Sequence, residues 1–274
     1  MSPQPPRVHN RPGRRAYLSI ALFALALVLF PFLFWYGTWF GRKLSDADLD
    51  AYFADASKPR HIQHALVQLG ERISGGRAAA RWYPLVVLQG ASPNLEIRQT
   101  AAWIMGQDRA YLPFHWALLM LIYDPEPMVR RNAALSLAGF GDGAARSELV
   151  AMLRPYIVRA PVAGPLRYRL KLGDYVNPGT LLARVGETEV RSPVPGEVRS
   201  LEHKEGAAVA PGDALAVLSA DTHHVWEALR ALYVVGQAED LEDVLRFTRP
   251  LPGLPASLAQ QAALTAQAIQ ARGK

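Results

Sequence analysis

The chain has 274 residues, of which half are apolar and 20% are charged, and its formal net charge is +6. This composition excludes a wholly disordered protein, and the absence of cysteine excludes disulfides, thiolate metal sites and thiol catalysis. Much of the positive charge flanks one apolar run near the N-terminus, so the charge gives no reason to expect nucleic acid as a partner.

The first forty residues contain a basic tail followed by that apolar run. Residues 1–15 are rich in proline and arginine and are predicted to be disordered. Residues 16–40 carry no charge, and Trp35, Tyr36 and Trp39 lie at one end like an interfacial aromatic belt. A helix of this length could cross a hydrocarbon core of about 30 Å. A retained transmembrane helix is predicted over 16–40 rather than a cleaved signal peptide, whose apolar region would be shorter.

The basic residues around this run predict its orientation. Four arginines precede the run, whereas Arg42 and Lys43 follow it. Since positive charge favours the cytoplasmic side, we expect a single-pass protein of a bacterial inner membrane with its N-terminus in the cytoplasm. Residues 41–274 would then lie in the periplasm, and residues 16–40 would contact the lipid bilayer.

Residues 44–155 are typical of short amphipathic helices. Ser45 is predicted to cap the first helix, which extends to about Ala56, and Asp48 completes a weak capping box. The following segments have apolar residues at helical spacing and are separated by glycine, proline or aspartate. They cover 62–73, 81–91, 96–108, 112–124, 128–142 and 145–155.

A period of 32 residues runs through this region, because Ile97-Arg98 opens one segment and Val129-Arg130 opens the next. Each pair is followed at the same offset by two alanines, which allow helices to approach closely. The stretch PEPMVRRNAALSLAGFGD resembles the second helix of HEAT-like repeats with its preceding turn. The resemblance implies an α-solenoid that serves as a scaffold or binding surface, and it implies no reaction.

The helical pattern is absent from residues 156–219 and resumes over 220–274. The intervening segment has short β-branched runs and Pro-Gly or Gly-Asp turns, which predict strands. It contains one unit twice, because Val158–Val185 aligns with Val190–Leu218 at an offset of 32 and then 33 residues. Neither copy could bury its own apolar face. The two are therefore expected to pack about a pseudo-twofold axis.

The repeated pattern R-[AS]-P-V-x-G with G-x-x-V-x-P-G-x-x-L resembles the biotinyl/lipoyl domain, a barrel-sandwich hybrid. In carriers of that family a lysine at the central hairpin holds the cofactor. The matching position falls on Val185 or Gly186, and neither has an amine, so no cofactor is expected. Related halves occur in membrane-fusion adaptors, where a long helical hairpin separates them. Here only residues 186–189 do so.

No catalytic constellation is present in the sequence. It contains no G-x-S-x-G, phosphate-binding loop or H-E-x-x-H motif, so the chain is predicted not to be an enzyme. His61 and His64 are three residues apart and His223-His224 are adjacent, but no third ligand stands at metal spacing. Capping or solvated histidines are expected there instead of a metal site, and His115 is expected in the core.

A cluster of acids in the C-terminal region has two explanations. A solvated or capping helix start is favoured, because the helix dipole attracts acids there. A divalent-cation site is the alternative. The residues concerned are Glu239, Asp240, Glu242 and Asp243.

The predicted fold class is multi-part: one N-terminal transmembrane helix and an all-α HEAT-like solenoid interrupted by a small all-β barrel-sandwich hybrid. Such modules predict a non-enzymatic, membrane-anchored scaffold or accessory subunit that docks onto an integral membrane or envelope protein complex. An adaptor-like accessory of an inner-membrane export system is the alternative. Candidate interface residues, for which core packing is the competing explanation, are Trp82, Tyr83, Trp103, Trp116, Trp226 and Tyr233.

Overall fold

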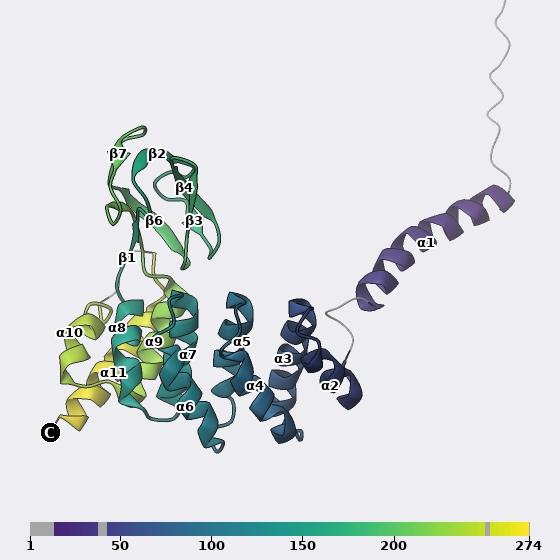
Figure 1. Ribbon diagram of the computed structural model, residues 1–274, viewed down its shortest axis with the longest axis horizontal. Coiled ribbons are helices and arrows are strands. Elements are labelled where there is room, and N and C mark those ends of the chain that lie inside the picture. The colour runs from purple at the N-terminus through teal and green to yellow at the C-terminus, as the bar shows by residue number, and fades with distance from the viewer. Residues whose placement is uncertain (1–13, 38–42, 250–252, 274) are drawn as a thin grey trace, which may run out of the picture. The chain divides into compact units, whose positions relative to one another are not determined.

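The structure is a computed structural model that describes residues 14–37, 43–249 and 253–273 (Figure 1). Residues 1–13 of the predicted tail and 38–40 of the predicted membrane segment lie outside the described residues. The described elements are eleven α-helices and two four-stranded antiparallel sheets.

The chain divides into two compact units, residues 1–68 and 69–274. The first contains α1 (Arg14–Gly37), α2 (Asp46–Ala54) and most of α3 (Pro59–Ser74). The predicted capping box of α2 is confirmed, because the Ser45 hydroxyl accepts from the Asp48 amide and the Asp48 carboxylate accepts from the Ser45 amide, each at 3.1 Å.

The prediction of a transmembrane helix over residues 16–40 is wrong. Among the described residues, no helix combines the length and the apolar character needed to cross a bilayer. The predicted fold class is corrected accordingly, and so is the predicted single-pass location in an inner membrane.

The second unit contains a stack of helices, here called the helical stack, which begins at α4. Its helices are α4 (Tyr83–Gln89), α5 (Leu95–Met105), α6 (Leu112–Leu121), α7 (Pro127–Gly139), α8 (Arg146–Met152), α9 (Thr222–Val235), α10 (Leu241–Leu245) and α11 (Ala256–Arg272). Single 3-10 turns cover Ala80–Trp82, Gly143–Ala145 and Ala238–Asp240. Gly236 adopts an extended ψ of 147° and ends α9, so that α10 is a separate helix.

The 32-residue period appears in the contacts of two arginines. The guanidinium of Arg98 in α5 donates to the carbonyl oxygens of Ser92 and Pro93, and that of Arg130 in α7 donates to those of Asp124 and Pro125. Each arginine also reaches an acid further along the chain. Arg98 Nε bonds Asp124 at 2.7 Å, and Arg130 Nε bonds Glu148 at 3.0 Å. The same local structure is therefore built twice.

Polar side chains also join successive helices of the stack. The buried Ser136 hydroxyl of α7 donates to the carbonyl oxygen of Ala102 in α5 at 2.8 Å. The buried Thr265 hydroxyl of α11 donates to the carbonyl oxygen of Leu229 in α9, also at 2.8 Å. Helices α5, α7, α9 and α11 thus lie in series, and the helices on both sides of the strand segment belong to one stack (Figure 1).

All eight described strands lie within residues 156–218, here called the β module. They are β1 (Tyr156–Arg159), β2 (Gly164–Tyr168), β3 (Tyr175–Val176), β4 (Leu181–Val185), β5 (Thr188–Arg191), β6 (Gly196–Leu201), β7 (Ala208–Val209) and β8 (Ala214–Leu218). One sheet has the order β1-β8-β6-β3 and the other β5-β4-β2-β7. Each sheet therefore combines strands from both copies of the repeated unit.

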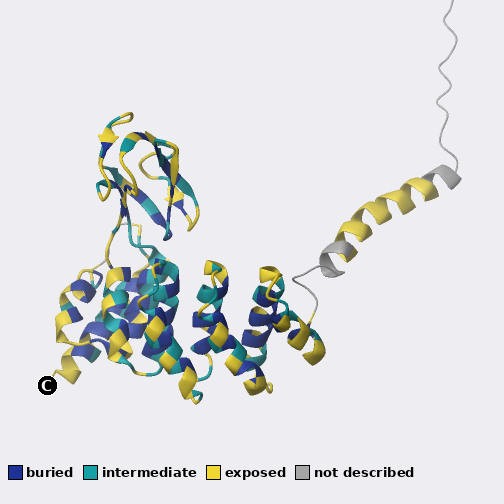
Figure 2. Cartoon of the chain, in the orientation of Figure 1, coloured by how far each residue is buried: buried dark blue, intermediate teal, exposed yellow. Residues whose placement is uncertain are grey.

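The two copies have equivalent hydrogen bonds, as a pseudo-twofold arrangement requires. Ala160 N donates to Asp213 O at 2.8 Å, and Ser192 N, at the equivalent position, donates to Thr180 O at 2.8 Å. Between the sheets lies an apolar core, seen as the dark residues inside the β module in Figure 2, that includes Leu166 and Val198. Met128 of α7 packs against this core, so the β module is attached to the helical stack.

Candidate functional site

The predicted interface aromatics fall into two groups. Trp82 and Tyr83 are buried, being 2% and 5% exposed. The guanidinium of Arg81 lies 4.1 Å from the Trp82 ring centroid, and the Tyr83 hydroxyl donates to Asp108 at 2.8 Å. These two residues therefore pack within their own chain. The remaining four are at least partly accessible, and they lie on three helices of the stack: Trp103, Trp116, Trp226 and Tyr233.

One face of α6 exposes four large apolar side chains, here called the α6 face. Three of them are spaced by four residues, and the fourth follows the end of the helix. Their exposed fractions are 64% for Leu112, 65% for Trp116, 75% for Met120 and 81% for Tyr123. Full-sized aromatic and aliphatic side chains at these exposures present on the order of 500 Å², the size at which an apolar patch on a monomer is often functional.

The opposite side of α6 explains why its outer face stays exposed. Phe114, Leu118 and Leu121 turn inward and are buried. His115, which the sequence placed in the core, is half-buried, and its Nε2 lies 2.6 Å from Asp142 Oδ2. A helix with apolar residues on both sides can bury only the inner ones within the stack, and its outer apolar residues stay exposed.

A groove of about 330 Å³ lies between α5, α7 and α9. Trp103, Asn132 and Glu227 contribute to its lining, together with Arg109 and Arg230. Burial raises the pKa of Glu227, although His223 and Arg230 act in the opposite direction. The Arg230 guanidinium lies 4.6 Å from the ring centroid of Trp226, which holds this arginine against the helix. The groove thus combines an aromatic surface with charged groups of both signs.

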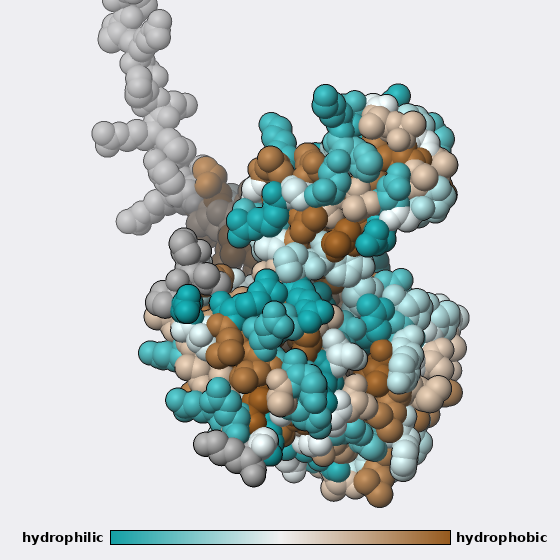
Figure 3. Space-filling model, turned by 90° about the vertical axis from the view of Figure 1, so that its left-hand side faces the viewer, coloured by the Kyte–Doolittle hydropathy of each residue, from teal (hydrophilic) through white to brown (hydrophobic). Residues whose placement is uncertain are grey.

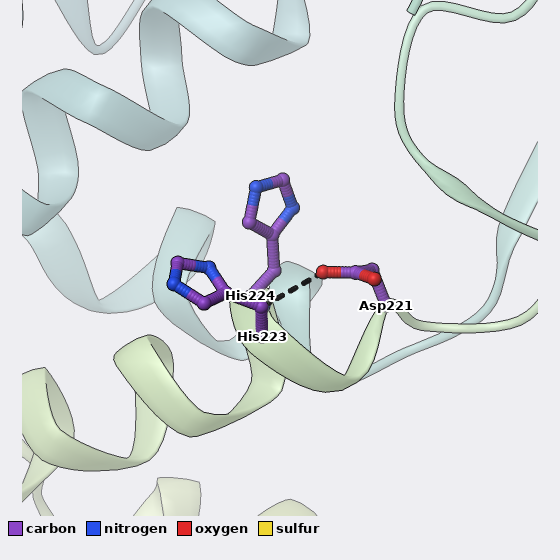
Figure 4. Close-up of side chains that lie close together, drawn as sticks. All are labelled: Asp221, His223 and His224. Atoms are coloured by element: carbon purple, nitrogen blue, oxygen red, sulfur yellow. Dashed lines mark hydrogen bonds between the residues drawn. The ribbon is translucent and has the colours of Figure 1, made fainter. Parts of the chain in front are cut away.

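At the start of α9, Asp221, His223 and His224 bring three metal-ligating groups together (Figure 4). Asp221 caps the helix, because one carboxylate oxygen accepts from the His224 amide at 3.0 Å and the other from the Tyr175 hydroxyl at 2.8 Å. Burial and this hydrogen bond raise the pKa of Tyr175 to about 12. Tyr175 belongs to β3, so Asp221 joins the β module to α9.

His224 makes a second contact at the start of α9, in this case with α7. Its Nδ1 lies 2.9 Å from Nη1 of the buried Arg131 on α7. Burial and the positive charge of Arg131 lower the pKa of His224 to about 4, so the ring is neutral at pH 7 and accepts from the guanidinium. A divalent cation here would face that guanidinium and the positive end of a helix dipole. The cluster is therefore better suited to hold elements together than to bind metal.

Three acids of the C-terminal acidic cluster, Glu239, Asp240 and Asp243, pair with arginines. Arg146 pairs with Asp240 and Glu239, each at 2.7 Å, and Arg154 pairs with Asp243 at 2.6 Å. Arg146 begins α8 and Arg154 follows its end, so these carboxylates attach α10 and the 3-10 turn before it to the last helix before the β module. In Figure 3, which views the α10 side of the molecule, small apolar patches are separated by polar ones.

The hairpin that matches the cofactor-bearing turn of biotinyl/lipoyl carriers joins β4 to β5. Val185 ends β4 with its side chain fully buried in the core of the β module, and Gly186 follows with a φ of 57°. The left-handed conformation favours glycine at this turn. Glu187, the next residue, is exposed.

The exposed apolar residues of the α6 face that sequence reasoning missed are Leu112, Met120 and Tyr123. The spacing of Leu112, Trp116 and Met120 was visible as apolar residues at i, i+4 and i+8, and Tyr123 follows at i+11. The same segment had a second apolar series at 114, 118 and 121, and a helix that is apolar on two sides is a signal of a second contact surface.

No family model matches this sequence. A stretch of 56 residues is 45% identical to the uncharacterized protein YqeB of Escherichia coli (strain K12). That stretch is 20% of this chain and 10% of YqeB. The chain thus spans about a tenth of the length of the curated relative that it matches.

Proposed function

We propose that this chain is a non-enzymatic scaffold that docks onto a partner protein complex through its helical stack and its β module. In this proposal the stack is a HEAT-like array, and the β module is a biotinyl/lipoyl-like unit without an attachment lysine. The repeated contacts of Arg98 and Arg130 support the first part. The exchange of strands between the two copies supports the second.

The α6 face is the observation that carries the proposal. Its four side chains remain 64–81% exposed, although Phe114, Leu118 and Leu121 on the other side of α6 are buried. Apolar area removed from water contributes about 25 cal/mol per Å², so covering this face would favour association even after the costs of ordering are subtracted. Trp116 lies in the middle of the face, where a binding hot spot is usually found.

Site-specific photo-crosslinking in cells tests the proposal. A benzoylphenylalanine at Trp116 should give a crosslinked species heavier than the chain itself, whereas the same group at Gln260, an exposed polar position on α11, should not. With the crosslinker at position 116, exchange of Met120 for Glu should remove that species without lowering the melting temperature, because the Met120 side chain is 75% exposed.

Two results would count against this function. Recovery of the monomeric chain alone after irradiation at both positions would show that the α6 face meets no partner. A crosslink that persists in a Met120→Glu background would place the partner elsewhere, since Met120 is the next residue of the face.

A further inference from the structure

A second hollow lies on the β module and is separate from the α6 face. It has a volume of about 490 Å³ and runs between β1 and β5, and it is here called the edge groove. Its walls are equivalent under the 32-residue repeat, because positions 157, 158, 159 and 161 on one side match 189, 190, 191 and 193 on the other. The groove therefore follows the pseudo-twofold axis of the module.

Both walls of the edge groove are strands at the end of a sheet. Within their sheets, β1 pairs with β8 alone and β5 pairs with β4 alone. An antiparallel strand paired on one side presents a row of N–H and C=O groups on the other. Two such rows flank one hollow, so an added strand could continue either sheet.

The side chains of the groove suit an extended acidic segment. Val158 and Val190 are buried in the core, while Ile157 is 44% exposed and supplies an apolar contact. Arg159 and Arg191 are both exposed at the groove. Glu189 is the only acid among the residues that line the groove with these two arginines.

That carboxylate is already shared. Glu189 bonds Arg191 at 2.6 Å and Arg184 of β4 also at 2.6 Å, and the two arginines lower the pKa of the Glu189 carboxyl. Arg159 donates to the carbonyl oxygen of Gly212. Two guanidinium groups therefore share one carboxylate, and Arg159 lines the same groove without an ion pair to an acid among the described residues. The resulting local excess of positive charge attracts acidic partners.

We propose that the edge groove binds an extended acidic segment of a partner protein, which adds as a strand along β1 or β5. Main-chain hydrogen bonds supply affinity in this mode, and alternate side chains supply specificity. Each wall strand has four residues, so about four peptide residues at ~3.4 Å each are held. A second copy of this chain is a poorer occupant, because its own Arg159 and Arg191 would meet the same charges.

This inference goes beyond the proposed function, since it concerns another surface and stands even if the α6 face binds nothing. The probe is a fluorescent ten-residue peptide that alternates valine and glutamate, with an alternating valine and lysine peptide as the charge control. Anisotropy with the full chain should show binding of the acidic peptide alone. Hydrogen exchange should slow at the amides of 156–159 or 188–191 when it binds.

Charge reversal tests the residues directly. Arg159→Glu with Arg191→Glu should weaken binding at least tenfold, and the milder Arg159→Gln with Arg191→Gln should weaken it less while keeping the fold. The matched control is Arg167→Glu, an exposed arginine of β2 outside the groove, which should change the affinity less than twofold.

Three outcomes would overturn the inference. They are equal binding of the two peptides, unchanged exchange at β1 and β5, or an unchanged affinity in the double reversal. A concentration-dependent dimer in light scattering that the acidic peptide fails to dissociate would assign the groove to a second copy instead. Because the crosslinking at Trp116 reports on a different surface, failure of one proposal can be told from failure of the other.

Discussion

Two helices of the stack approach closely at Gly106, and filling this contact should destabilise the protein. Gly106 follows α5 with a φ of −76°, which alanine adopts without strain. A methyl group added there would lie 2.8 Å from Cβ and 3.1 Å from Cα of Ser136 in α7. Since van der Waals contact begins near 3.5 Å, Gly106→Ala must push α5 and α7 apart.

The magnitude follows from three contributions. Overpacking a buried contact costs about 1–3 kcal/mol. Displacing the Ser136 hydroxyl weakens its bond to the Ala102 carbonyl, at about 1 kcal/mol. Replacing glycine by alanine at a compatible φ returns about 0.4–1 kcal/mol through the unfolded state. The free energy of unfolding should therefore fall by about 2 kcal/mol.

Urea unfolding followed by circular dichroism at 222 nm measures this loss. Ser136→Gly should partly rescue Gly106→Ala, because it removes the opposing methylene, and the double-mutant cycle should give a coupling of about 1 kcal/mol or more. Gly143→Ala is the control, since its added methyl would meet only Arg146 Cδ at 3.8 Å. An unchanged midpoint for Gly106→Ala, or two effects that simply add, would refute the close approach of α5 and α7.

Two further predictions concern the helices after the β module. The pKa of His224 is about 4 in the fold against an ordinary 6.5, so the unfolded chain binds more protons between these values and stability should fall as pH drops from about 6.5 to 4. This slope in the melting temperature should flatten in His224→Gln, and an equal slope in both proteins would contradict the assignment. Thr265→Val should lower the free energy of unfolding by about 1 kcal/mol, because it removes the bond to the Leu229 carbonyl. A urea midpoint equal to that of the parent protein would show that this bond contributes nothing.

Local patterns predicted the elements well where one rule dominated. Ser45 and Asp48 form the capping box that their spacing indicated. The duplicated unit over residues 158–218 folds as eight strands, because Gly and Pro-Gly turns recur at equivalent positions. These features depend on residues a few positions apart, and such distances are accessible to periodicity arguments.

Features that depend on distant residues could not be predicted. Trp82 and Trp116 looked equivalent in sequence, yet one is buried beneath Arg81 and the other is 65% exposed. Arg131 meets His224 across 93 residues, which no local pattern encodes. The apolar run near the N-terminus misled for the opposite reason. Its composition dominated the prediction, whereas no helix among the described residues combines the length and the apolar character needed to cross a bilayer.

The pairing of Tyr156 with Leu218 has a consequence for how the two parts fold. These residues begin and end the β module, and the helices on either side, α8 and α9, contact each other. If the β module were unfolded, α8 and α9 would be connected by a long flexible loop and would have to make their contact across it. Closing such a loop rather than one of a few residues costs roughly 2 kcal/mol more. In the folded module, strand pairing keeps Tyr156 and Leu218 at the distance of neighbouring strands, and this favours the contact between α8 and α9. A substitution in the core of the β module is therefore expected to weaken the contact between these helices without touching either of them.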